Sequence, residues 1–127
     1  MSDIPGDLRY TKEHEWVRVE DDLVVIGITD HAQNALTDIV YVELPEIGGQ
    51  VDAMDEFAAV DSVKSSSPIF SPISGSVAEV NEVLEDTPET INKDPYGDGW
   101  IAKLQTSDIE QVNGLLSAED YRTLIGE

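Results

Sequence analysis

The sequence of 127 residues contains no cysteine, which excludes disulfide bonds and leaves no thiolate to act as a nucleophile or metal ligand. It has no apolar run that approaches the ~18 consecutive residues of a membrane span. Residues 1–7 lack the positively charged region and the apolar stretch of an export signal. We therefore expect a cytoplasmic protein that does not enter a membrane.

Positive charge is also scarce. Only 7 residues are Lys or Arg against 27 that are Asp or Glu, which gives a formal net charge of −20. Such a field repels nucleic acids and anionic membrane surfaces, so neither is an expected partner. Hydrophobic residues make up 40% of the sequence, which is compatible with a folded core. Adaptation to a saline cytoplasm would explain the acidity, because salt screens exposed charges; an ordinary acidic protein is the alternative.

Groups that usually perform catalysis are few. His14 and His31 are the only histidines, no G-x-S-x-G elbow is present, and no His/Cys set has metal-ligand spacing. The sequence lacks a glycine motif of the kind that cradles phosphate. Acidic residues are so frequent that no single pair stands out as a general acid and base. We therefore predict a protein that is not an enzyme and holds no metal ion.

What the sequence does contain is a series of short β-prone segments. Residues 14–28 predict two strands joined by a turn at Asp21–Asp22, since apolar and β-branched residues flank that turn. Asp30 predicts the N-cap of a short helix. Further strands are predicted for residues 39–44 and 100–104.

Signals for two short helices follow the last predicted strand. Each begins with a serine followed three residues later by an acidic residue, in the segments Ser107–Glu110 and Ser117–Asp120. Gly114 predicts the end of the first helix.

Many short strands with few, peripheral helices indicate one mainly β domain over residues 1–127. We expect its core to cover about residues 14–105 and a C-terminal helical extension to cover about residues 107–127.

An internal repeat flanks the middle of the sequence. Residues 47–56 and 73–82 share the pattern I-x-G-x-V-x-x-apolar-[DN]-E, and each copy has a proline just upstream. The shared glycine supplies a bend or bulge that a Cβ would obstruct, and the shared valine begins the next strand. Two such copies predict a pseudo-twofold arrangement with Lys64 at the turn between the halves.

Lys64 is one of only four lysines in the sequence. Residues 57–63 are β-prone, the segment Ser65–Pro68 has turn chemistry, and a strand resumes at Ile69, so we expect Lys64 at an exposed hairpin tip. An exposed lysine is protonated at neutral pH and is a poor unassisted nucleophile. Asp61, Ser62 and Ser65 are short and polar or acidic, so they offer no means of activating the amine. Lys64 is therefore predicted to be an attachment site and not a catalyst.

Several segments taken together resemble a known family, the glycine cleavage system H proteins. Val60–Lys64, followed by Ser71–Gly75, is similar to the lipoyl-lysine segment of that family. Four other motifs match in the family's order and extend the resemblance over nearly the whole chain: His14–Trp16, Gly27–Gln33, Val40–Pro45 and Pro95–Trp100. Biotin carriers have Met-Lys-Met at the site, and lipoyl domains of 2-oxo-acid dehydrogenases lack the first, second and last of these four motifs.

The resemblance implies a barrel-sandwich hybrid of the lipoyl/biotinyl hammerhead type, with short peripheral helices and a C-terminal helix. It implies lipoate joined to Lys64 through an amide bond by a lipoate-attaching enzyme. The arm would accept an aminomethyl group from glycine decarboxylase (P protein) and present it to aminomethyltransferase (T protein), and dihydrolipoamide dehydrogenase (L protein) would reoxidise it. The chain itself would be a non-catalytic carrier in glycine catabolism and one-carbon metabolism.

The resemblance also implies roles for three acidic residues. Glu15 matches a polar position that holds the loaded arm in a surface cleft, and Glu43 and Asp61 match acids near the docking surface. The sequence departs from the family at two cleft positions. Glu13 stands where a small hydroxyl residue is common, and Pro68 stands where an acidic residue is common.

Two other functions remain open at this point. An H-like protein could serve lipoate relay or another lipoate-dependent pathway. A protein of a different class, an unmodified acidic adaptor, could share the same fold.

Overall fold

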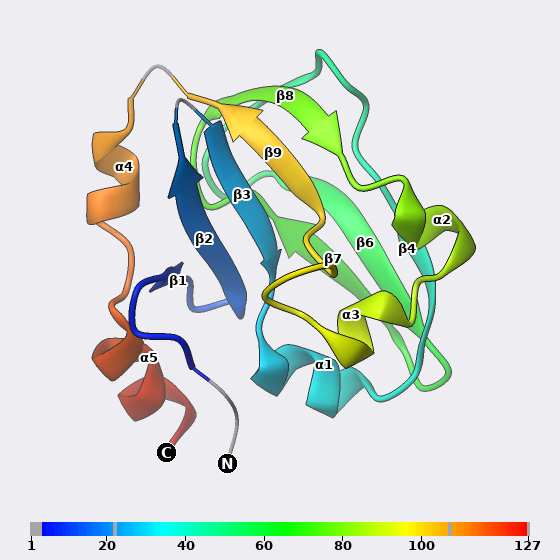
Figure 1. Ribbon diagram of the computed structural model, residues 1–127. Helices are drawn as coiled ribbons and strands as arrows, with labels where there is room; N and C mark the ends of the chain where they lie inside the picture. The colour runs from blue at the N-terminus through cyan, green and yellow to red at the C-terminus, as the bar shows by residue number, and fades with distance from the viewer. Residues whose placement is uncertain (1–3, 22, 107, 127) are drawn as a thin grey trace.

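A computed structural model describes residues 4–21, 23–106 and 108–126, and short strands dominate it (Figure 1). The strands are β1 (Arg9–Tyr10), β2 (Glu15–Glu20), β3 (Leu23–Ile28), β4 (Ile39–Glu43), β5 (Gln50–Val51), β6 (Glu56–Ser62), β7 (Ser66–Phe70), β8 (Gly75–Val80) and β9 (Ala102–Gln105). The helices are α1 (Asp30–Leu36), α2 (Val83–Asp86), α3 (Thr90–Lys93), α4 (Glu110–Asn113) and α5 (Ala118–Ile125). No helix of the described ranges is long and apolar enough to cross a membrane.

The strands form two antiparallel sheets that enclose a common core. The larger sheet has the order β1-β2-β3-β9-β8-β5, and the smaller sheet has the order β4-β6-β7. Apolar side chains of the smaller sheet and of α1 to α3 pack against Ile28 of β3 and against Ile101, which directly precedes β9. Within the described residues the sheets do not close into a barrel. The prediction of a mainly β fold with short helices and a C-terminal helix is confirmed.

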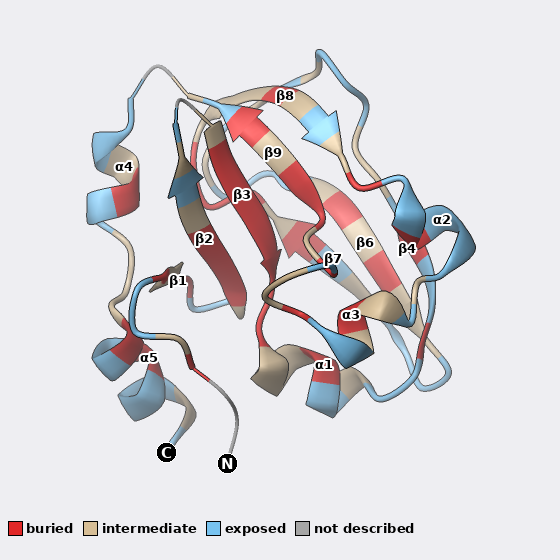
Figure 2. Ribbon diagram, in the orientation of Figure 1, coloured by how far each residue is buried: buried red, intermediate tan, exposed pale blue. Residues whose placement is uncertain are grey.

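Strand β3 is buried on both faces, which explains its uninterrupted apolar run (Figure 2). Val24 and Ile26 pack with residues of β8 and β9 between the sheets. Val25 points the opposite way and joins a second cluster with Tyr10 and Trp16. A strand with one solvated face would have to alternate polar and apolar residues, and this strand does not.

The segments near the two ends of the chain cover the face of β2 and β3 that carries Trp16 and Val25. Tyr10 and Leu116 form an isolated bridge, with reciprocal backbone hydrogen bonds of 2.9 Å. The rings of Tyr10 and Tyr121 are stacked with centroids 4.8 Å apart. Figure 1 shows α5 beside β1, so the C-terminal helix completes the second cluster.

The two sequence repeats pair with each other. Gln50 of the first copy lies opposite Ser76, its equivalent in the second copy, and Val51 lies opposite Gly75. The Val77 amide donates to the Gly49 carbonyl at 2.9 Å, which is the symmetry-related counterpart of the Val51–Gly75 pairing. A Cβ on Gly75 would lie 2.5 Å from the Gln105 carbonyl oxygen, so this position requires glycine. The pairing agrees with the predicted local twofold arrangement.

Among the element boundaries that differ from the predicted ones, two have a local explanation. The N-cap of α1 is Thr29 and not Asp30, because Thr29 is extended and its Oγ1 accepts a hydrogen bond from the Ala32 amide at 3.2 Å. The strand predicted for residues 100–104 begins at Ala102. Trp100 still belongs to the preceding loop, because its amide donates to the Gly97 carbonyl at 3.2 Å.

The C-terminal helices follow their predicted signals in part. Gly114 is the C-cap of α4, and Ser117 caps α5 by accepting a hydrogen bond from the Asp120 amide at 3.2 Å. The predicted cap Ser107 lies outside the described residues, as does Asp22 of the predicted β2–β3 turn.

Candidate functional site

Lys64 lies in the short turn between β6 and β7, and its side chain is exposed. The Ser62 hydroxyl oxygen accepts hydrogen bonds from the backbone amides of Lys64 and Ser65, at 3.1 and 3.0 Å. The Ser62 amide in turn donates to the Ser65 carbonyl at 2.8 Å. Lys64 Nζ donates to the Ala35 carbonyl of α1 at 3.3 Å. A tightly bonded turn therefore carries a long, solvated side chain.

The turn is shorter than the sequence predicts, because Pro68 lies within β7 and not in the turn. Strand β7 is at the edge of its sheet, with Pro68 opposite Ala59. Since the Ser62 amide bonds to Ser65, the alternation of an antiparallel pair directs the amides of Ser67 and Ile69 toward β6. The Pro68 nitrogen faces away from β6, so its missing N–H removes no ladder hydrogen bond.

The structure brings two of the three predicted acidic residues to one face. Asp61 of β6 is half-buried, and its Oδ1 accepts a hydrogen bond from the Ser66 hydroxyl at 2.5 Å. Glu43 is exposed at the end of β4, opposite Ala59. Glu43 and Asp61 both point away from the core, because the alternate residues Val42 and Val60 are buried.

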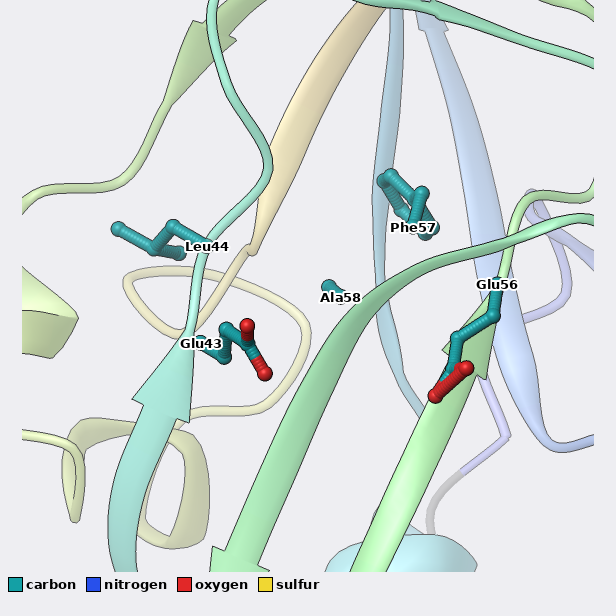
Figure 3. Close-up of a pocket in the computed structure, with 5 residues that line it drawn as sticks. All are labelled: Glu43, Leu44, Glu56, Phe57 and Ala58. Carbon is teal, nitrogen blue, oxygen red and sulfur yellow. The ribbon is translucent and has the colours of Figure 1, made fainter.

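A cavity of about 260 Å³ lies at the Glu43 end of this sheet (Figure 3). Figure 3 shows Glu43 and Leu44 at the end of β4 and three residues from the start of β6, Glu56, Phe57 and Ala58. Lys64 lies at the other end of β6. The cavity is therefore separate from the lysine.

Glu15 does not join the other two acids, because its side chain is buried between the sheets. It is 1% exposed, and its Oε1 accepts a hydrogen bond from the Thr11 hydroxyl at 2.6 Å. Its Oε2 accepts a hydrogen bond from the Phe70 amide of β7 at 3.3 Å. Burial raises the pKa of the Glu15 carboxyl from 4.5 to about 7, and the two hydrogen bonds limit that rise. Glu15 thus ties β2 to the strand that follows Lys64.

This raised pKa predicts a pH-dependent contribution to stability. Because folding raises the pKa of Glu15, the folded state binds this proton more tightly, so the contribution is complete below pH 4.5 and is lost as the pH rises to about 7. Urea unfolding should be measured at pH 5 and at pH 8. The unsubstituted protein should lose about 2 kcal/mol more unfolding free energy between these pH values than Glu15→Gln does.

The control for this measurement is Glu85→Gln, since Glu85 is an exposed acid of α2 that does not contact Glu15. That variant should keep the pH dependence of the unsubstituted protein. Equal pH dependence in Glu15→Gln and the unsubstituted protein would show that the buried carboxyl has no raised pKa.

Asn92 of α3 supports the lysine turn from a distant segment, and sequence reasoning missed it. Its Oδ1 accepts a hydrogen bond from the Ile39 amide at 2.9 Å, and its Nδ2 donates to the Thr37 carbonyl at 2.7 Å. These bonds hold the α1–β4 connection, where the Asp38 carbonyl accepts the Val63 amide at 3.1 Å. No spacing in the sequence relates Asn92 to this connection.

The two histidines lie together beside α5, and His31 is in α1, four residues before the Ala35 carbonyl that Lys64 contacts. Their ring centroids are 5.0 Å apart, and His14 Nδ1 is 2.8 Å from the Tyr121 hydroxyl. Burial, followed by the neighbouring His31, lowers the pKa of His14. In the described part of the chain, no group of three or more His, Asp or Glu side chains could hold a metal ion.

Comparisons with known proteins assign the chain to a family. The family model described as "Glycine cleavage H-protein" matches residues 8–127. A glycine cleavage system H protein of Xylella fastidiosa (strain 9a5c) is 54% identical over 126 residues, which cover 98% of this chain and 96% of that protein. One from Halorhodospira halophila is 52% identical over 128 residues, covering 100% of this chain and 98% of that protein.

The fold matches a solved structure as well. The crystal structure of a glycine cleavage system H protein from Mycobacterium marinum aligns with a TM-score of 0.90 and 41% identity. The alignment covers 98% of this chain and 100% of that chain. The chain therefore belongs to the glycine cleavage H-protein family.

Proposed function

We propose that this chain is the lipoyl carrier of a glycine cleavage system, with lipoate joined to Lys64 Nζ by an amide bond. The observation that carries the proposal is the exposed Lys64 amine on a tightly bonded hairpin turn, in a member of this family. The protein would present the arm to other enzymes and would not itself be a catalyst.

The residues around Lys64 fit an attached acyl chain. Ser62 on one side of Lys64 and Ser65 and Ser66 on the other have short side chains, and Val63, between Ser62 and Lys64, is exposed. The Nζ hydrogen bond to the Ala35 carbonyl is long at 3.3 Å and lies at the exposed surface, so releasing it costs little. Lipoate bound there would supply a dithiolane that carries an aminomethyl group and two electrons.

The turn would act as a fixed base for a mobile arm. The hydrogen bonds of Ser62 and the Val63–Asp38 backbone bond restrain the base, so motion is confined to the lysine side chain and its cargo. A tethered group has a high effective concentration in a docked enzyme's cleft. The proposed partners are the glycine decarboxylase (P protein), aminomethyltransferase (T protein), dihydrolipoamide dehydrogenase (L protein) and a lipoate-attaching enzyme.

The three predicted acids receive different roles in this proposal. Glu43 and Asp61 would contact basic groups of a docked partner, because both lie on the solvent side of the small sheet. Glu15 would act indirectly, by holding the Phe70 amide of the strand that follows Lys64, since its own carboxyl is buried.

Glycine decarboxylation with purified partners tests this function. The lipoylated chain, added to the decarboxylase with glycine, should release carbon dioxide at a rate that depends on the concentration of the chain. The unlipoylated chain is the control and should not support the reaction. Lack of release by the lipoylated chain, together with efficient transfer of its lipoate to another acceptor domain, would favour a relay function over glycine cleavage.

A further inference from the structure

Strand β4, which lies beside the lysine hairpin, contains a β-bulge at Val40. Ile39 lies opposite Ser62 and Tyr41 lies opposite Asp61, so Val40 is an extra residue in β4. Val40 and Tyr41 are consequently both turned to solvent, at 53% and 54% exposure, although the residues on either side of them are buried. Bulges re-aim side chains and are frequent near functional sites. Here the bulge exposes two large apolar side chains in succession.

The strand register places Tyr41 in a defined surface next to Lys64. Residues directly opposite in neighbouring strands share a face of the sheet. The solvent side therefore has two rows across β4, β6 and β7, which we call the outer face: Tyr41–Asp61–Ser66 and Glu43–Ala59–Pro68. The first row is the one nearer to Lys64 along β6 and β7.

The composition of the outer face specifies the chemistry of its partner. Tyr41 is a large apolar group with a polar tip, and Tyr is among the residues that most often anchor protein interfaces. Asp61 and Glu43 flank it, in a chain of net charge −20. Val63, 67% exposed, extends the apolar surface to the residue before Lys64. This surface is complementary to an apolar pocket rimmed by Arg and Lys.

Among proteins of that kind, the geometry favours the enzyme that acylates Lys64. Such an enzyme must bring an acyl carbon to bonding distance of Nζ, so it has to cover the hairpin tip and its strands. Enzymes that act on the far end of a long arm can leave the outer face open. The acylating enzyme must also distinguish Lys64 from Lys12 and Lys93, which are exposed too, so it has to recognise more than the amine.

We propose that the outer face, with Tyr41 as its anchor and Val40 and Val63 beside it, is the docking surface of the lipoate-attaching enzyme. The inference rests on the proposed function of Lys64. In the docked complex Nζ forms an amide bond with the carbonyl carbon of an acyl-adenylate. The bond from that carbon to the phosphate oxygen breaks, the phosphate leaves with the bonding electrons, and Nζ loses its extra protons to solvent.

The test compares the double substitution Val40→Ser with Tyr41→Ser against a matched control, Val19→Ser with Ile47→Ser. Val19 and Ile47 are also exposed apolar residues, at 45% and 61%, but they lie outside the outer face. The rate of modification is measured with a purified lipoate ligase and lipoyl-adenylate at low concentrations of full-length chain. We expect kcat/KM to fall at least about tenfold in the outer-face variant, mainly through KM, and to be unchanged in the control. Tyr41→Phe should retain most of the rate, because it keeps the apolar ring.

The outer-face variant, with Val40→Ser and Tyr41→Ser, is then lipoylated to completion and assayed with the glycine decarboxylase. Unchanged decarboxylation together with slow acylation supports the assignment to the attaching enzyme. Equal acylation of the variant and the unsubstituted chain, or an equal loss in both assays, overturns it. Failure of the proposed function looks different, because the unsubstituted chain itself would then remain unmodified at Lys64 or, once lipoylated, would not support decarboxylation.

Discussion

Replacement of Lys64 by arginine should abolish lipoylation and, with it, all activity of the chain in glycine decarboxylation. Arginine keeps the positive charge and a long side chain, but its guanidinium is a rigid, always protonated fork and does not substitute for a lysine amine. The exposed position and a single 3.3 Å hydrogen bond to Ala35 indicate that folding will not suffer. Intact mass of protein from a lipoate-sufficient host, followed by peptide mapping, measures the modification.

Lys12→Arg is the matched control, because Lys12 is also exposed but lies far from the hairpin in the sequence. That variant should gain the lipoyl mass to the same extent as the unsubstituted chain, on the peptide that contains Lys64. A lipoyl increment that persists in Lys64→Arg, or its absence from the unsubstituted chain, would contradict the attachment site.

Replacement of Trp16 by alanine should cause the largest loss of stability among the substitutions considered. Trp16 is fully buried, and its Nε1 donates to the Pro95 carbonyl at 2.9 Å. Its ring occupies the space that a side chain at Gly27 would need, since a Cβ there would lie 2.7 Å from ring atoms. Removing the ring leaves a cavity and an unpaired carbonyl oxygen, so we expect a loss of about 3–5 kcal/mol in urea unfolding.

Val19→Ala on the same strand is the control for this measurement. Val19 is largely exposed, so its truncation should change the unfolding free energy by no more than about 0.5 kcal/mol. Losses of similar size in the two variants would mean that β2 is sensitive along its whole length and that the Trp16 ring has no special role.

Local patterns explain why the lysine hairpin could be predicted from the sequence. The β-prone segment before Lys64 and the short polar residues after it are adjacent in the chain, and adjacent residues also form the hairpin. The register of β5 against β8 follows from the two repeats, since the equivalent residues Gln50 and Ser76 lie opposite each other. Thr29 and Asp30 are both good capping residues, so the sequence could not resolve a displacement of one position.

The remaining features depend on partners that are distant in the sequence. Pro68 reads as a turn residue unless β7 is known to be an edge strand. A glutamate such as Glu15 is expected at the surface from the sequence. Its burial depends on hydrogen bonds from the Thr11 hydroxyl and from the Phe70 amide, which is distant in the sequence. Asn92 supports the Lys64 turn through bonds to the backbone of residues 37 and 39, which are more than fifty residues away in the sequence. Such contacts arise from the assembled sheets and not from any local signal.

The Tyr10–Leu116 bridge and the Tyr10–Tyr121 stack have a consequence for biosynthesis. Residues 116–125 leave the ribosome after all nine strands, so the aromatic face around Tyr10 lacks Leu116 and Tyr121 and is partly uncovered while the chain is still growing. The β6–β7 hairpin needs only neighbouring residues and can form much earlier. We expect the lysine tip to be in place on a nascent chain that is still prone to aggregate through its partly uncovered aromatic face.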